Sequence, residues 1–215
     1  CLIIGNSGDG LYAGDGCHEF GACALGLNSE GVVSWRLSIG HRVTADPVGA
    51  AREALLAHEG AALAFMVSDF HADASRIESV LEHEVKIPVI GGLAADDQQW
   101  RQCALYANEA VLTDCIVAVG AYGPLRFSIH VENTITPVGS PGTVESASGT
   151  RIDAISGLPA MQFIERETGK PVLRSDRGIT SLMLVDPAPT PLKRLRAIAQ
   201  DIGQSKQNLQ LYGGI

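Results

Sequence analysis

The chain has 215 residues, of which 46% are hydrophobic and 19% are charged. This composition predicts a sizeable buried core and excludes a wholly disordered chain. The formal net charge of −8 argues against a protein that binds nucleic acid non-specifically. Residues 1–170 carry a net charge of −11 and residues 171–215 one of +3, and the basic tail favours a solvated helix face over a binding patch.

The start of the chain and its cysteines bear on where the protein resides. No apolar run approaches the roughly 20 residues of a membrane span, and residues 1–20 do not have the pattern of a signal peptide. The chain opens on a cysteine without an initiator Met, which predicts a piece of a longer polypeptide or a processed chain. An odd number of cysteines without CxxC spacing disfavours a disulfide framework and a zinc site, and predicts a reducing cytoplasm. The five are Cys1, Cys17, Cys23, Cys103 and Cys115.

Residues 1–59 predict three strands and a helix. An apolar strand over residues 1–4 runs into a glycine-rich turn over residues 5–10, which can present backbone N–H groups to an anion. Strands over residues 17–27 and 32–41 are joined by the hairpin signal Asn28-Ser29-Glu30-Gly31. Asp46-Pro47 then predicts the start of a helix that runs to about Glu59.

Two segments share the order strand, acidic loop, helix, strand, Gly-Gly. The first has strands over residues 61–68 and 86–90, around a helix capped by Asp73, and these strands should be parallel. The second has strands over residues 180–186 and 209–212, around a helix over residues 190–202. The likeness predicts a weak internal duplication.

Antiparallel strands and one further helix are expected between these segments. A hairpin over residues 98–107 and 111–122, centred on Glu109, would place Cys103 directly opposite Cys115 as two buried, free thiols. A strand over residues 126–131 and a helix over residues 158–167 follow, the helix ending at Gly169. The predicted fold class is α/β, with mixed sheets built from β–α–β units and antiparallel hairpins.

Three stretches together resemble the FIST domain, a sensory module of bacterial signalling proteins. They read IPVIGGLAADD, ALYANEAVLTDCIVAVGAYGPL and NTITPVGSPGTVESASGTRIDAISGLPAMQFIERETG. The resemblance covers residues 1–170, with the first strand–helix unit of the family missing before Cys1. Residues 171–215 would be a linker and the opening β–α–β of a second FIST-like half. The sequence departs from the family at Asn6, where Cys is common, and at Ile135, where an aromatic residue is common.

The resemblance implies a cytoplasmic sensory domain that binds a small ligand, not an enzyme. The implied ligand is an amino acid or a similar small metabolite, and the implied partner is a signalling output protein such as a histidine kinase or a cyclase. An alternative is a heme-binding sensor that responds to nitric oxide. An alternative of another class is an N-terminal-nucleophile amidohydrolase that uses Cys1, whose own α-amine would serve as the base.

The candidate ligand site combines two glycine-rich segments that follow apolar strands. The first segment, residues 5–10, can cradle a ligand carboxylate, or it can be a tight turn without a ligand. The second segment, Gly91-Gly92 with Asp96-Asp97, offers acidic side chains that can hold a ligand amino group, or these acids are solvated residues of a turn. We expect the two segments to line one cavity at strand ends. The candidate ligand-binding residues are Gly5, Asn6, Ser7, Gly8, Gly91, Gly92 and Asp96.

Histidines are considered only for the heme alternative, since no metal site is expected. His18, His71 and His130 are the alternative heme ligands, because their positions on or beside strands allow them to face an apolar pocket. His58 and His83 lie near predicted helix C-termini and are expected to be ordinary surface residues.

Overall fold

A computed structural model of the chain describes most of its residues. They are 2–14, 16–96, 101–130, 138–148 and 151–171, with the backbone of 181–184, 194–200 and 209–211. The chain divides into two compact units, residues 1–127 and 128–215. The expected boundary near residue 170 lies inside the second unit and stays a prediction. None of the helices in these described ranges has the length and apolarity that crossing a bilayer requires.

The first unit is built on a four-stranded mixed sheet in the order β4-β9-β5-β6. Its strands are β4 (Ser34–His41), β5 (Leu63–Ser68), β6 (Val89–Leu93) and β9 (Cys115–Tyr122). β5 and β6 are parallel, as the β–α–β pattern predicts, whereas β9 is antiparallel to both β4 and β5. The mixed α/β fold class is thereby confirmed.

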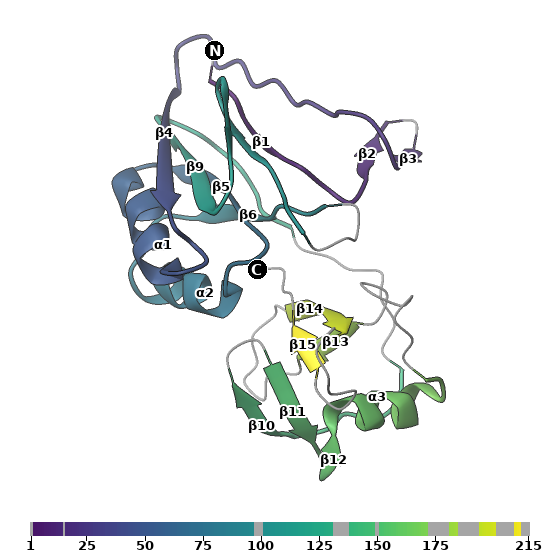
Figure 1. Ribbon diagram of the computed structural model, residues 1–215. Coiled ribbons are helices and arrows are strands. Elements are labelled where there is room, and N and C mark those ends of the chain that lie inside the picture. Colours follow the sequence, from purple (N-terminus) through teal and green to yellow (C-terminus); the bar gives the residue numbers. More distant parts are fainter. Residues whose placement is uncertain are drawn as a thin grey trace. The chain divides into compact units, whose positions relative to one another are not determined.

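Helices α1 (Pro47–Leu55) and α2 (Ala74–His83) cover one face of this sheet (Figure 1). Both begin where capping residues predict, because Asp46 accepts a hydrogen bond from the Gly49 N–H and Asp73 accepts one from Ser75. A short 3-10 helix, η1 (Leu56–His58), extends α1. The core on this side joins the helices to the sheet through Leu55, Ile77, Met66, Ile116 and Ala118.

A small antiparallel sheet covers the other face, in the order β1-β7-β8. Its strands are β1 (Ile4–Asn6), β7 (Leu105–Ala107) and β8 (Ala110–Leu112). The buried Leu105 and the half-buried Ile4 pack with Val67 and Val117 of the larger sheet. The first unit therefore has three layers, and two sheets face each other across the second core.

The predicted hairpin exists, but its register differs from the expected one. Asn108 and Glu109 form a two-residue turn that pairs Leu105 with Leu112. Asp114, with φ +50°, then interrupts the extended backbone between β8 and β9. Cys103 and Cys115 are therefore not opposite each other in a hairpin, and that prediction is wrong. Both are nevertheless buried in the same core as free thiols.

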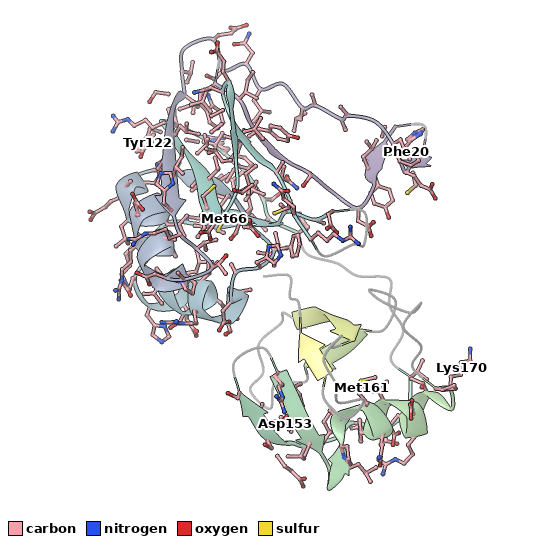
Figure 2. The ribbon with its side chains drawn as sticks, viewed as in Figure 1. Phe20, Met66, Tyr122, Asp153, Met161 and Lys170 are labelled. Carbon is pink, nitrogen blue, oxygen red and sulfur yellow. The ribbon has the colours of Figure 1, made fainter. Side chains whose placement is uncertain are left out.

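One predicted strand is shorter than expected, and another does not form. β2 (Leu11–Ala13) and β3 (Gly16–His18) form a hairpin, but residues 19–29 contain no strand, so the strand expected over 17–27 ends at His18. Phe20 is 89% exposed there (Figure 2). Residues 126–130 also form no strand, contrary to prediction. Apolar side chains alone do not make a strand, because its backbone needs a neighbouring strand to pair with.

The second unit is a sheet in the order β10-β11-β15-β14-β13, with β12 paired to β11. Its elements are β10 (Val144–Ser148), β11 (Arg151–Ile155), β12 (Leu158–Pro159), α3 (Ala160–Thr168), β13 (Ser181–Leu184), β14 (Arg194–Gln200) and β15 (Leu209–Leu211). α3 ends at Gly169, whose φ of +66° is the left-handed cap predicted for it. The helix expected over residues 190–202 is wrong at residues 194–200, which form β14.

Candidate functional site

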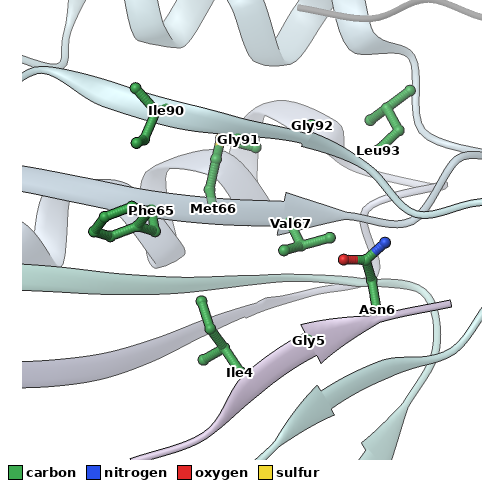
Figure 3. A pocket seen from close by; sticks show the side chains of 10 residues that line it. All are labelled: Ile4, Gly5, Asn6, Phe65, Met66, Val67, Ile90, Gly91, Gly92 and Leu93. Carbon is green, nitrogen blue, oxygen red and sulfur yellow. The ribbon is translucent and has the colours of Figure 1, made fainter. Parts of the chain in front are cut away.

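A cavity of about 380 Å³ lies between the two sheets of the first unit (Figure 3). It is bounded by β1 of the small sheet and by β5 and β6 of the larger one. β1 and β6 are each the edge strand of their sheet. The lining residues are Ile4, Gly5, Asn6, Phe65, Met66, Val67, Ile90, Gly91, Gly92 and Leu93.

The register of β5 and β6 sets which side chains face the cavity. Phe65 pairs with Ile90 and Val67 with Gly92, and neighbouring residues of paired strands point to the same face. Met66 alternates to the opposite face and packs under the helices. Phe65, Val67 and Ile90 are half-buried, so their apolar faces remain partly accessible from the cavity.

The two glycines of β6 have different structural roles. A Cβ at Gly91 would overlap the Met66 carbonyl oxygen, so only glycine fits there without movement of the backbone. A Cβ at Gly92 would meet no atom within 4 Å, and it would project from the face shared with Val67. The missing side chain at Gly92 therefore leaves space that a ligand, or a larger residue, can occupy.

Ser7, directly after β1, ties this strand to two segments, one that follows β6 and one that precedes β7. Its hydroxyl donates to the Ala95 carbonyl at 2.6 Å and accepts from the Ala104 N–H at 2.9 Å. Its backbone N–H donates to Ala104 O at 2.8 Å, and its carbonyl accepts from Ala95 N at 2.9 Å. These bonds use both hydroxyl roles of Ser7, so the residue positions β1 and does not line the cavity.

Asn6 supplies the polar side chain of the lining. Its amide nitrogen donates to the Ser7 carbonyl at 2.7 Å, which fixes the orientation of the amide group. Among the described residues nothing donates to its Oδ1 oxygen, which can accept a hydrogen bond from a ligand.

The structure brings together four of the seven predicted ligand-binding residues. Gly5, Asn6, Gly91 and Gly92 line the cavity, whereas Ser7, Gly8 and Asp96 do not. The glycines lie within β1 and β6, not in turns after them, and these strands belong to facing sheets, not to one sheet.

The acidic part of the predicted site has a structural role. The Asp96 carboxylate accepts hydrogen bonds from the backbone N–H groups of Arg101, at 2.7 Å, and Gln102, at 3.4 Å. Asp97, the second acid of that loop, lies outside the described residues.

None of the three alternative heme ligands lines the cavity. His18 ends β3, His130 is exposed, and the ring of His71 pairs with Asp69, with Nδ1 2.9 Å from Oδ1. Cys1, the nucleophile of the hydrolase alternative, lies outside the described residues.

Asp69 is a buried acid that the sequence did not single out. It is 4% exposed and accepts backbone hydrogen bonds from His71 and Asp114, both at 2.9 Å. Burial acts to raise the pKa of Asp69, but these bonds and those from the side chains of His71 and Cys103 outweigh it and hold the pKa below its usual range. Asp69 therefore joins the loop after β5 to the turn before β9.

His58 was expected at the surface, and this prediction is wrong. It is 1% exposed, with Nε2 2.7 Å from the Ser38 hydroxyl and Nδ1 3.0 Å from the Tyr122 hydroxyl. The burial arises because η1 continues α1 directly onto β9, where Gly120 leaves room for the ring.

Comparison with known proteins links residues 1–157 to the FIST N domain, whose family model they match. Over 101 residues, or 46% of this chain, the sequence is 32% identical to the uncharacterized protein MJ1623 of Methanocaldococcus jannaschii. The match spans 20% of the length of that archaeal protein. No solved structure matches the chain significantly.

Proposed function

We propose, on the premise that this chain belongs to the FIST N domain family, that its first unit is a sensory unit which binds a small ligand between β1 and β6. The cavity is the observation that carries this proposal. It has the volume and the mainly apolar lining of sites for small molecules, and it holds a polar side chain that can orient a ligand. An amino acid or a similar small metabolite is the ligand class that the family resemblance implies.

A ligand at this place would act on two edge strands. β1 has three residues, pairs with β7, and is fastened by the Ser7 bonds to Ala95 and Ala104. A ligand that contacts both β1 and β6 favours one spacing of the two sheets over others, and any ligand shifts such an equilibrium by its difference in affinity. The Ser7 bonds would transmit this spacing to the segments that carry Ala95 and Ala104.

We propose a binding role and not a catalytic one. None of the described lining residues carries a group that exchanges a proton near neutral pH. Burial raises the pKa of the Cys103 and Cys115 thiols to about 11, which makes them poor nucleophiles.

A heme does not fit this cavity, because no histidine, cysteine, methionine thioether or tyrosine points into it from the described residues; Met66 faces the helices. An absorption spectrum of the freshly purified protein tests this directly, since a Soret band would support the heme alternative.

The output and the compartment are also part of the proposal. We propose that a signalling protein such as a histidine kinase or a cyclase receives the conformational signal. Free cysteines at positions 17, 23, 103 and 115 support residence in a reducing cytoplasm.

Native mass spectrometry of freshly purified protein tests the proposed function. We expect an added mass from a retained small molecule, lost in the Gly92→Val variant because the new side chain enters the cavity. Gly26→Val is the matched control, since Gly26 also has no atom within 4 Å of its Cβ position but lies outside the cavity. If neither retained nor added metabolites distinguish wild type from Gly92→Val, the proposal fails.

A further inference from the structure

We infer that the cavity selects an uncharged, mainly apolar ligand with one hydrogen-bonding head group, and that it excludes zwitterions such as free amino acids. This inference rests on the proposed function of small-ligand binding, and it replaces the amino acid that the family resemblance implies with an uncharged metabolite. It follows from what the cavity lining contains, from the polar atom it offers, and from its size.

The lining carries no side chain with a formal charge. All ten described lining residues are aliphatic, aromatic, glycine or asparagine. An ammonium or a carboxylate group that packs against these apolar side chains loses part of its hydration, and this cost is recovered only where an opposite charge or several hydrogen bonds replace the water. The acid that sequence reasoning offered to a ligand ammonium, Asp96, accepts backbone hydrogen bonds and does not line the cavity.

The glycine-rich segment does not form an anion cradle either. Gly5 and Asn6 are residues of strand β1, and their backbones pair with Tyr106 and Leu105 of β7. The Ser7 N–H donates to the Ala104 carbonyl. In an extended strand, successive N–H groups point to opposite edges, so those of β1 do not converge on one point as they do in the turns that bind anions.

Among the described lining side chains, the Oδ1 atom of Asn6 is the polar acceptor that can orient a ligand. The amide nitrogen of Asn6 is held by the Ser7 carbonyl, so Oδ1 is left as an acceptor on the side of Val67 (Figure 3). A hydroxyl or a primary amide can donate to this oxygen, while the apolar remainder of the ligand packs on Phe65 and Ile90. A volume of 380 Å³ equals roughly thirteen water molecules at about 30 Å³ each, which suits a ligand of similar size.

A charge series with a constant branched apolar tail tests the inference. The probes are isocaproamide, isocaproate, isohexylamine and leucine, titrated into the 215-residue chain and followed through the backbone NMR signals of Gly92 and Asn6. We expect isocaproamide to bind at least tenfold more tightly than each charged probe. Gly92→Val should abolish this binding, and Gly26→Val should preserve it.

A second variant is independent of whether Gly92→Val folds. Asn6→Leu keeps the approximate shape of the side chain and removes the acceptor, at a strand position that is exposed. We expect it to weaken isocaproamide at least fivefold and to leave the weak binding of the charged probes unchanged.

The outcomes separate this inference from the proposed function. Binding of leucine as tight as that of isocaproamide, lost in Gly92→Val, would overturn the inference and leave a ligand site in place. The same holds for a charged retained ligand that Gly92→Val removes. If no probe and no retained molecule responds to Gly92→Val, the proposed function itself fails.

Discussion

Acidification should destabilise the first unit through the buried imidazole of His58. The Ser38 hydroxyl donates its single hydrogen to the Ala54 carbonyl at 2.6 Å, so it must accept from Nε2 of His58. The Tyr122 hydroxyl then donates to Nδ1, and the bonded form of the ring is the neutral one. Burial lowers the pKa of His58, and the charge of Arg36 lowers it further, although the Ala118 backbone carbonyl opposes both.

The sign and size of the effect follow from proton linkage. The folded state holds His58 neutral below the unfolded-state pKa of about 6.5, so the unfolded state binds more protons there. The free energy of unfolding should therefore fall as the pH drops below about 6.5, by at most about 1.4 kcal/mol per pH unit for one proton. The loss continues until the folded-state pKa is reached, and above about pH 7.5 this group contributes no pH dependence.

Urea unfolding followed by tryptophan fluorescence measures this slope, because Trp35 lies on β4 next to the strand that carries Gly120. His58→Gln keeps a donor and an acceptor without a titrating ring, and it should flatten the slope between about pH 5 and pH 7. His41→Gln, at an exposed position, should keep the wild-type slope. Equal slopes in wild type and His58→Gln would refute the assignment of His58 as a buried neutral base.

Two further predictions concern the interior of the first unit. A Cβ at Gly120 would lie 2.6 Å from His58 Nδ1, so Gly120→Ala should lower the free energy of unfolding by about 1–3 kcal/mol; unchanged stability in urea would show that the ring moves aside easily. The Cys103 and Cys115 thiols, with pKa values of about 11, should react with a thiol reagent only as fast as the protein unfolds, whereas the exposed Cys17 reacts at once. Prompt reaction of both buried cysteines would mean that this core is open to solvent.

Sequence reasoning succeeded where structure is decided locally. Asp46 and Asp73 cap their helices with their own carboxylates, and Gly169 adopts the left-handed conformation that ends α3. The parallel pairing of β5 and β6 follows from the helix between them. Each of these features depends on residues within one short stretch of chain.

Sequence reasoning failed where residues distant in the sequence decide the local structure. The segment Arg194–Gln200 has apolar residues at helical spacing, but Arg194, Leu195, Arg196 and Ala197 also alternate as in a strand. Pairing with β13 and β15 selects the strand. The burial of His58 likewise depends on Gly120, more than sixty residues away, and no local pattern announces it.

The cavity depends on local sequence and on contacts between distant residues, and this explains why only part of it could be predicted. Apolar strands with internal glycines drew attention to Gly5 and Gly92, and these residues do line one cavity. They meet because two sheets pack face to face, which depends on the pairing of β1 with β7 across a hundred residues. Protein interiors are normally filled to crystal-like density, whereas no atom lies within 4 Å of a Cβ at Gly92, so the apolar side chains on that face lack some of the contacts that a packed core would give them. A ligand that restores those contacts binds for the same physical reason that a core packs, and this reason favours apolar over charged molecules.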